Sequence, residues 1–403
     1  MNAFLVDGIR TPVGNFGGTL AQVRTDDLAA HTIAELMKRN EGLDPASIGD
    51  VILGCANQAG EDNRNVARMA SLLAGLPCTV PGETVNRLCA SGLAAATNAS
   101  RMLALGDADV VIAGGVENMT RGPWVMSKAS KPFGRDSKLY DSSFGWRFIN
   151  PKLEAVYGVD GMGVTAENLV AKYGISREDQ DAFAYASQMK AKAAREAGRL
   201  AEEIIPVAIP RRKLEDDIFA HDEFIRDNTT LEVLSTLRPA FKKEGGSVTA
   251  GNASGLNDGS AALLLANESG LKSQSLEPIA QILSSAVVGV EPRIMGIGPV
   301  KASEIALERA GLTFDDLDVI ELNEAFAAQA LSCIREWGLS DNDSRINPNG
   351  GGISIGHPLG MTGSRILLAA ARQLQRTGGK YGLVTLCIGV GQGYAVVIQN
   401  TKA

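Results

Sequence analysis

The chain has 403 residues, 45% of them hydrophobic, so it can bury a large core, and its length predicts two or three domains. Its net charge of −7 at pH 7 argues against nucleic acid as the main partner. Five cysteines at irregular spacings, without a CxxC pair, argue against a disulfide framework or a structural metal site. An N-terminus without an apolar signal region, and the lack of any apolar run of membrane-spanning length, predict a soluble cytoplasmic protein that does not bind membranes.

The first 120 residues predict alternating strands and helices. The strands are continuous apolar runs, typical of a parallel sheet that is buried on both faces. Thr25 is the expected N-cap of the first helix. In chain order we expect strand 3–6, helix 26–39, strand 48–55, helix 65–73, a helix that starts at Cys89 and ends near residue 106, and strand 109–115.

The same order of elements recurs late in the chain. We expect helix 300–310, strand 317–323, helix 358–376 and strands 382–387 and 394–398. One offset of 268 residues aligns Asp50-Val51-Ile52 with Asp318-Val319-Ile320, Cys55 with Asn323, and Cys89 with His357. Three matches at a single offset indicate a duplicated α/β half.

The residues between the two halves have a different character. Residues 121–249 are more charged and less regular, with a helix expected near 177–197, and strand-like runs at 261–265 and 278–283 return the chain to the sheets. We therefore expect an N-terminal half of residues 1–120 plus 250–275, an inserted loop domain of residues 121–249, and a C-terminal half of residues 276–403.

Cys89 lies at a predicted helix start, where unpaired backbone N–H groups and the helix dipole favour a thiolate. A thiolate attacks carbonyl carbon, which suits a nucleophile, whereas the alternative is a small buried cysteine in a tightly packed helix. Under the duplication, a pseudo-twofold axis brings His357 toward Cys89 as its base; the alternative for His357 is a turn residue beside Pro358. His31 and His221 are interpreted as structural or surface residues.

Cys387 follows a predicted strand and opens the glycine-rich run Cys387-Ile388-Gly389-Val390-Gly391-Gln392-Gly393. Glycines let the backbone approach a ligand closely and leave N–H groups free to face a developing oxyanion. The run differs from a dinucleotide-binding fingerprint because a strand, not a helix, follows it. A second reactive cysteine suits a reaction in which a proton moves on and off carbon.

Four blocks of the sequence together resemble the signature blocks of the thiolases. They are Asn86-Arg87-Leu88-Cys89-Ala90-Ser91-Gly92, Asn323-Glu324-Ala325-Phe326, Gly356-His357-Pro358-Leu359-Gly360 and Cys387-Ile388-Gly389-Val390-Gly391-Gln392-Gly393. Residues 249–259 resemble a further block, and the resemblance runs essentially from end to end. Within the family, residues 54–65 and 145–151 are most similar to the 3-oxoadipyl-CoA thiolases of the beta-ketoadipate pathway of aromatic catabolism.

This resemblance implies a duplicated five-layer α-β-α-β-α architecture with an inserted loop domain. It also implies cleavage of a 3-oxoacyl-CoA by CoA to acetyl-CoA and a shortened acyl-CoA, which is succinyl-CoA when the substrate is 3-oxoadipyl-CoA. Cys89 is then the nucleophile that carries the acyl group, His357 its base, and Cys387 the acid and base on carbon. His357 and a water held by Asn323 form one oxyanion hole, and the backbone N–H groups of Cys89 and Gly389 form the other.

The resemblance implies CoA as a co-substrate, with no permanently bound cofactor and no metal. The CoA-binding residues it indicates are Ser254, Arg226 and Met162, with Arg211, Arg212 and Lys213 as further candidates for the phosphates. The three basic residues have the alternative of a solvated charged face. Gly161 stands where some short-chain members carry a histidine, which favours 3-oxoadipyl-CoA over acetoacetyl-CoA.

A 3-oxoadipyl substrate ends in a carboxylate, which needs a cationic partner. We expect Arg147 to be that partner; the alternative is a surface arginine beside Trp146. The family also implies a homo-oligomer, either a dimer or a dimer of dimers, that is, a homotetramer.

Other functions stay open at this point. They are an acetyl-CoA acetyltransferase (acetoacetyl-CoA thiolase), a broad 3-ketoacyl-CoA thiolase, a decarboxylating condensing enzyme, a cysteine hydrolase and a non-catalytic acyl-CoA-binding relative. The second cysteine, Cys387, argues against the condensing enzyme, and the presence of both Cys89 and His357 argues against a non-catalytic relative.

Overall fold

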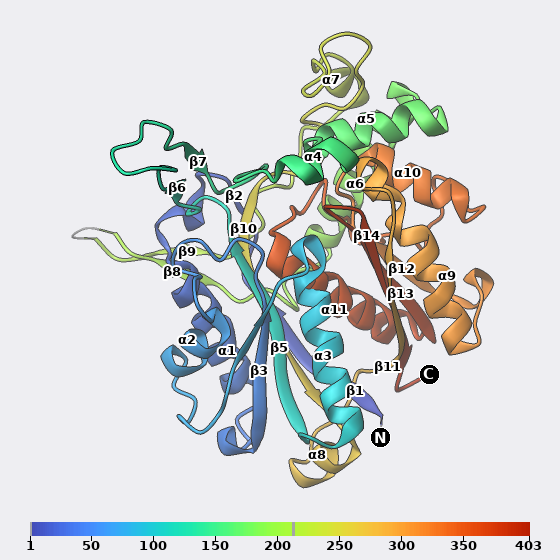
Figure 1. Ribbon diagram of the computed structural model, residues 1–403. Helices are drawn as coiled ribbons and strands as arrows, with labels where there is room; N and C mark the ends of the chain where they lie inside the picture. Colours follow the sequence, from blue (N-terminus) through green and yellow to red (C-terminus); the bar gives the residue numbers. More distant parts are fainter. Residues whose placement is uncertain (1, 212–213) are drawn as a thin grey trace.

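The computed structural model describes residues 2–211 and 214–403 and is dominated by one large mixed sheet (Figure 1). Its strands are β1 (Ala3–Arg10), β2 (Gly14–Asn15), β3 (Ile48–Gly54), β4 (Glu83–Val85), β5 (Val110–Asn118), β10 (Asn257–Ala266), β11 (Ala280–Gly289), β12 (Val319–Leu322), β13 (Tyr381–Ile388) and β14 (Gln392–Asn400). The strand order is β12-β13-β14-β11-β1-β10-β5-β3-β4, with β2 paired to β10.

The same pattern of parallel and antiparallel strand pairing occurs in both halves of the sheet. In the first half β3 pairs with β5 in parallel, and β5–β10 and β10–β1 are antiparallel. In the second half β12 pairs with β13 in parallel, and β13–β14 and β14–β11 are antiparallel. The two halves join through the antiparallel pair β1–β11. The predicted duplication is therefore confirmed in the topology.

Helices cover the sheet in layers. The helices are α1 (Thr25–Arg39), α2 (Val66–Leu73), α3 (Ser91–Leu105), α4 (Pro151–Tyr157), α5 (Met162–Tyr173), α6 (Arg177–Glu196), α7 (Leu231–Ser235), α8 (Glu268–Ser273), α9 (Gly298–Ala310), α10 (Ala327–Glu336) and α11 (Leu359–Thr377). Residues of α3 and α11 share one hydrophobic cluster with strands of both halves. Clusters on the opposite faces join α1 and α2 to the first half, and α9 and α10 to the second. This arrangement gives the five expected layers.

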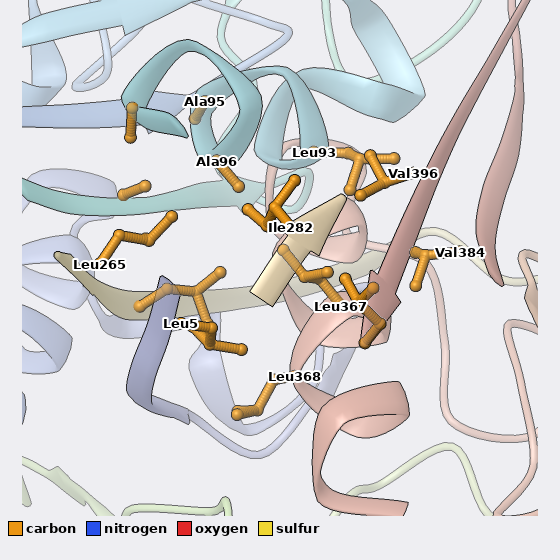
Figure 2. Close-up of a cluster of buried hydrophobic side chains, with 14 of the residues drawn as sticks. Leu5, Leu93, Ala95, Ala96, Leu265, Ile282, Leu367, Leu368, Val384 and Val396 are labelled. Carbon is orange, nitrogen blue, oxygen red and sulfur yellow. The ribbon is translucent and has the colours of Figure 1, made fainter. Parts of the chain in front are cut away.

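The central layer explains why the strands are apolar on both faces. Figure 2 shows Leu93 of α3 and Leu367 of α11 among Leu5, Val384 and Val396 from the strands of both halves. Each fully buried aliphatic side chain of this kind contributes about 1.5–3 kcal/mol relative to leaving it in water. Alternate residues of the same strands face the outer helices, so each strand needs a continuous apolar run.

The helices α3 and α11 cross closely near their N-termini. A Cβ atom on Gly92 would lie 2.5 Å from the Gly360 carbonyl oxygen, and one on Gly360 would lie 2.3 Å from the Val116 carbonyl oxygen. Ser364 Oγ donates a hydrogen bond to the Gly92 carbonyl at 3.1 Å. Glycine is needed at both positions because only it allows this approach. The crossing brings the starts of the two equivalent helices together.

Two local expectations about helix starts are wrong. Thr25 is the first residue of α1 and not its N-cap, which is Arg24; the Thr25 N–H donates to the Glu61 carboxylate at 3.2 Å instead of needing a side-chain cap. Pro358 is the N-cap of α11 rather than a residue of its first turn. In both cases the chain ahead of the helix is held by contacts that are distant in sequence, which local capping rules do not include.

Residues 121–249 carry α4 to α7 and two hairpins, β6 (Trp124–Met126) with β7 (Leu139–Asp141) and β8 (Val207–Ile209) with β9 (Asp217–Phe219). The division of the chain at residues 120, 249 and 275 stays a prediction. Within the described residues, no helix combines the length and apolarity that crossing a bilayer requires.

Candidate active site

The turn before α3 carries Cys89. It is a short 3-10 helix, η3 (Leu88–Ala90), and the side chain of Asn86 accepts a hydrogen bond from the Leu88 N–H at 2.9 Å. Leu88 has a φ of 47°, in the left-handed region that leucine rarely adopts. Strain of this kind costs of the order of 1–3 kcal/mol and concentrates at functional sites. The surrounding structure therefore holds the half-buried Cys89 in a turn that its own sequence does not favour.

The electrostatic environment keeps the Cys89 thiol protonated. Burial raises its pKa to about 11, and the nearby Glu117 carboxylate acts in the same direction. Hydrogen bonds from the backbone N–H groups of Gly389 and of Cys89 itself lower the pKa but do not offset burial. The backbone N–H groups at the helix start thus favour the thiolate, but less strongly than burial opposes it. A base must remove the proton before this sulfur can attack.

His357 is buried, and its ring orientation is fixed by Thr362. The Thr362 hydroxyl donates its proton to the Pro358 carbonyl at 2.8 Å, so its oxygen accepts from His357 Nδ1–H at 2.7 Å. This pairing leaves Nε2 without a proton, and Asn323 Nδ2 donates to it at 3.3 Å. The His357 backbone N–H donates to Asn257 Oδ1 at 2.9 Å. The histidine thus presents one defined nitrogen as an acceptor.

Burial also keeps the His357 ring neutral. It lowers the pKa of His357 to about 3, and the positive charge of Arg365 acts in the same direction. A neutral imidazole is the form that accepts a proton from a thiol. Gly356, just ahead of it, has a φ of 112°, and a Cβ there would lie 2.7 Å from Val13 Cγ1. Glycine is therefore required for the turn that delivers His357.

Asn323 follows β12 and has one free polar atom. Its Nδ2 donates to His357 Nε2, while its buried Oδ1 has no hydrogen-bond partner among the described residues. A buried carbonyl oxygen of this kind is a suitable acceptor for a water molecule. The neighbouring Glu324 carboxylate anchors the segment by accepting from Asn347 Nδ2 at 2.7 Å and Ser187 Oγ at 2.7 Å.

Cys387 and Gly389 lie at the end of β13. Cys387 is fully buried, and burial raises its pKa well above the ordinary value; a negative charge on Cys89 would raise it further. Gly389 is followed by Val390, whose φ of 64° is unusual for a β-branched residue. Positive φ values thus occur next to both backbone N–H donors, at Leu88 before Cys89 and at Val390 after Gly389.

The elements that carry these residues meet. The η3 turn contacts both α11, which begins two residues after His357, and β13, which carries Cys387. Gly389 donates to Cys89, and Asn323 donates to His357. The site thus combines a thiol with a pair of backbone N–H groups, a neutral imidazole and a second buried thiol. Such a set suits acyl transfer through a cysteine thioester.

The predicted CoA-binding residues lie in different places. Met162 is partly exposed at the start of α5, and its Sδ lies 3.6 Å from where a Gly389 Cβ would be. Ser254 donates its N–H to the Ala325 carbonyl at 3.0 Å, which places it beside the segment after Asn323. The exposed Arg226 lies over the Phe224 ring, and Phe224 contacts Gly255, next to Ser254. These three residues therefore lie around the side of the site formed by the 121–260 segment.

Of the basic run predicted as a phosphate site, the structure describes only Arg211. Arg211 is exposed and pairs with Asp217 at 2.8 Å across the β8–β9 hairpin. That hairpin packs its apolar residues against the cluster that contains α1 and extends away from the body (Figure 1). Arg212 and Lys213 lie outside the described residues.

Arg147 lies beside Asn57, which contacts Glu117 in the first half of the chain. Its guanidinium donates to Asn57 Oδ1 at 3.1 Å and to the Ser142 carbonyl at 3.3 Å, and no carboxylate of the described residues pairs with it. The Asn57 N–H in turn donates to Glu117 Oε1 at 3.0 Å. A partly buried guanidinium without an acidic partner is suited to bind a carboxylate.

Three residues that position the site are not among those predicted from the sequence. Thr362 and Asn257 orient His357, and the buried Glu117 accepts N–H groups from Ala56 and Gly360, each at 2.9 Å. Of these, only Thr362 lies near its partner in the sequence, as a hydroxyl residue in the first turn of the helix that follows His357. The other two act across separations of 100 residues or more, or between the two halves.

Comparison with known proteins identifies the family. Residues 3–269 match the model of the thiolase N-terminal domain, and residues 276–400 match that of the thiolase C-terminal domain. The chain is 56% identical over 399 residues to a beta-ketoadipyl-CoA thiolase of Acinetobacter baylyi, with 99% of each chain covered. It is 55% identical over 398 residues to a 3-oxoadipyl-CoA/3-oxo-5,6-dehydrosuberyl-CoA thiolase of Escherichia coli, again with 99% of each covered.

A solved structure gives the same answer for the fold. The crystal structure of the Bacillus anthracis acetyl-CoA acetyltransferase aligns with a TM-score of 0.91 at 40% identity, covering 99% of this chain and 98% of that one. The resemblance of the four sequence blocks is therefore confirmed over the whole chain. This protein belongs to the thiolase family and is an acyltransferase.

Proposed function

We propose that this enzyme cleaves 3-oxoadipyl-CoA with CoA to give acetyl-CoA and succinyl-CoA. The observation that carries the proposal is the 55–56% identity, over essentially the full length, to relatives named for this substrate. The acetyl-CoA acetyltransferase of Bacillus anthracis is similar at 40% identity, so acetoacetyl-CoA is the competing substrate. The reaction steps described below are the same for both substrates.

The first half of the reaction forms the acyl-enzyme. His357 Nε2 takes the proton of Cys89, and the sulfur attacks the 3-keto carbon of the substrate. The bond between C2 and C3 then breaks, which leaves the acyl group on Cys89 and the enolate of acetyl-CoA. Cys387 gives its proton to the enolate carbon, and acetyl-CoA leaves.

The second half returns the enzyme to its starting state. The Cys387 thiolate takes the proton of the incoming CoA thiol, and the CoA sulfur attacks the thioester carbonyl. The Cys89 sulfur leaves as a thiolate and recovers its proton from His357. Because Cys89, His357 and Cys387 all have pKa values that keep them neutral at rest, the proposed cycle starts and ends without a buried charge.

Two oxyanion sites serve this cycle. One consists of His357 and a water bound to the free Oδ1 of Asn323, and the other of the backbone N–H groups of Cys89 and Gly389. Donors placed in advance at such positions typically contribute about 3 kcal/mol each. The strained φ values of Leu88 and Val390, which flank the second pair, support this assignment.

CoA is the co-substrate, and we assign Met162, Ser254 and Arg226 to its binding because they border the Cys89 side of the molecule. Met162 lies beside Gly389, and Arg226 is exposed at the outer end of the same side. Arg211 is far less suited, since Asp217 already pairs with it on a distant hairpin. We further propose that the enzyme is cytoplasmic and forms a dimer or a dimer of dimers.

We assign the terminal carboxylate of 3-oxoadipyl-CoA to Arg147. An Arg147→Ala variant is expected to raise KM for 3-oxoadipyl-CoA by about 10–100-fold, the loss typical of a charge-assisted contact, while leaving acetoacetyl-CoA within about threefold. Arg293→Ala is the matched control, because Arg293 lines the groove beside Met162 but already pairs with Asp160 at 2.9 Å.

The decisive measurement is CoA-dependent cleavage of 3-oxoadipyl-CoA, acetoacetyl-CoA and a long 3-oxoacyl-CoA by the wild-type enzyme. A kcat/KM for 3-oxoadipyl-CoA at least tenfold above the others supports the proposal. Preference for acetoacetyl-CoA makes the enzyme an acetyl-CoA acetyltransferase, and steady release of CoA without a CoA acceptor reveals a hydrolase. Equal losses on both substrates in Arg147→Ala remove the assignment of the carboxylate contact.

A further inference from the structure

A small cavity lies between α11 and the segment that follows α6, and arginines dominate its lining. The polar side chains around it are Arg199, Glu203, Asn349, Arg365, Arg372 and Arg376. The last three arginines are seven and four residues apart on α11, so they lie on one face of that helix. Of the lining residues, only Arg365 influences the Cys89 site, through the effect of its charge on His357.

Several of these arginines direct unused N–H groups into the protein interior. Arg365 is 2% exposed, and its Nη1 and Nη2 have no hydrogen-bond partner among the described residues. The buried Nε atoms of Arg199 and Arg372 likewise have none. Buried guanidinium N–H groups are normally paired, so four unpaired nitrogens around one cavity indicate a missing acceptor.

The neighbouring acidic side chains are already engaged. Asp7 pairs with Arg372 at 2.5 Å, Glu202 with Arg376 at 2.8 Å and Glu203 with Arg10 at 2.7 Å. Within residues 2–211 and 214–403, no carboxylate lies in ion-pair distance of Arg199.

Arg365 has only a distant acidic neighbour. The Glu321 carboxylate lies 4.0 Å from it, and both oxygens of Glu321 lack hydrogen bonds. Burial raises the pKa of Glu321 to about 8 and lowers the pKa of Arg365. The lining itself carries four arginines and one carboxylate, that of Glu203, so positively charged side chains predominate around the cavity.

We propose that this cavity binds one small monovalent inorganic anion of the size of chloride. The free volume of about 10 Å³ is small, so the site suits a single compact ion better than an extended ligand. One negative charge would supply an acceptor for the unpaired N–H groups of Arg199 and Arg365. The site is structural: it holds α11 to the segment after α6.

The first test locates the anion directly. Crystals of the full chain are soaked in sodium bromide, and anomalous scattering is measured at the bromine edge. A bromide peak within hydrogen-bond distance of the Arg199 and Arg365 side chains supports the proposal. A cavity that contains only water, without an anomalous peak at high bromide concentration, overturns it.

The second test measures binding in solution. Chloride is titrated against gluconate, which is too large for the cavity, at constant ionic strength, and Tm is followed. The wild type is expected to gain about 1–3 °C with saturation, the shift produced by a ligand that binds only the folded state.

A matched pair of variants tests whether the chloride-dependent shift in Tm comes from this cavity. Arg199→Gln is expected to lose it, because Arg199 is half-buried and its replacement leaves the core intact. Arg195→Gln, which removes a surface arginine of α6 paired with Asp227, is expected to retain it. If Arg199→Gln responds to chloride as the wild type does, the proposal is wrong.

Discussion

The two halves of the molecule place different side chains at equivalent positions. In the first half Cys55 follows Gly54 of β3, and Glu117 lies two residues beyond Gly115, the β5 partner of Gly54. In the second half Asn323 follows Leu322 of β12, and Cys387 lies two residues beyond Thr385, the β13 partner of Leu322. The sets at equivalent positions are thus Cys55, Cys89 and Glu117 in one half, and Asn323, His357 and Cys387 in the other.

The two sets differ in whether their polar atoms already have hydrogen-bond partners. Glu117 accepts three backbone N–H groups, from Ala56, Asn57 and Gly360, and Cys55 Sγ lies 3.4 Å from Asp62 Oδ2. In the other set, Asn323 has an unpaired oxygen and His357 an unprotonated nitrogen. The same backbone arrangement therefore holds fully hydrogen-bonded, structural side chains in one half. In the other half it leaves polar groups available for chemistry.

The largest expected effect is the loss of kcat when Cys89, the proposed nucleophile, is replaced. Cys89→Ser is expected to lower kcat by about 10⁴-fold or more, because serine is a far weaker nucleophile at a neutral histidine. Steady-state cleavage of 3-oxoadipyl-CoA and mass spectrometry of the trapped acyl-enzyme measure it. Cys78→Ser, at an exposed cysteine, is the control and is expected to behave as the wild type. Acylation of another cysteine in Cys89→Ser would contradict the assignment.

The next effect compares the equivalent positions 323 and 55. Asn323→Ala is expected to lower kcat by about 10²-fold with little change in KM, since it removes the acceptor that holds the oxyanion water. Cys55→Ala is expected to stay within about threefold, because Cys55 is buried against Asp62 and its pKa is raised well above the ordinary value. Similar losses in kcat from both variants would show that the two halves do not differ in role.

The smallest effect tests the structural part of the comparison. Burial raises the pKa of Glu117 to about 7 from the ordinary value of 4.5. The native state then binds more protons than the unfolded state between these values, so Glu117 makes the free energy of unfolding fall as pH rises from about 4.5 to 7. The total contribution is about 3 kcal/mol.

Glu117→Gln is expected to reduce this pH dependence by the equivalent of one proton. Chemical denaturation at pH 5, 6, 7 and 8 measures the difference between wild type and variant. Asp258, whose pKa burial raises to about 6, keeps its own contribution in both proteins and serves as the internal reference. Identical slopes for the wild type and Glu117→Gln would show that Glu117 stays ionised in the fold.

Much of the fold follows from the sequence because it depends on long local patterns. The apolar strands, the helix starts after Cys89 and His357, and the single offset that relates them all concern residues close in the chain or repeated along it. The expected site residues Cys89, His357, Cys387, Asn323 and Gly389 came from the same blocks. Their roles stay predictions until the variants are measured.

The rest depends on contacts between segments far apart. The Nδ1–H tautomer of His357 requires the positions of Thr362 and Pro358, and the high pKa of Cys89 requires the burial that both halves create. Left-handed conformations at Leu88 and Val390 contradict local preference and are imposed by the surrounding structure. The position of Arg211 on a distant hairpin could not be read from its charge.

The crossing of α3 and α11 also limits how this enzyme can change. At Gly92 and Gly360 the main chains of the two repeats touch where a side chain would otherwise intervene. A single methyl group at either residue would act as a wedge and widen the gap between sulfur and imidazole. The absence of side chains at Gly92 and Gly360 therefore sets the distance between the two reacting groups, although neither glycine takes part in the chemistry.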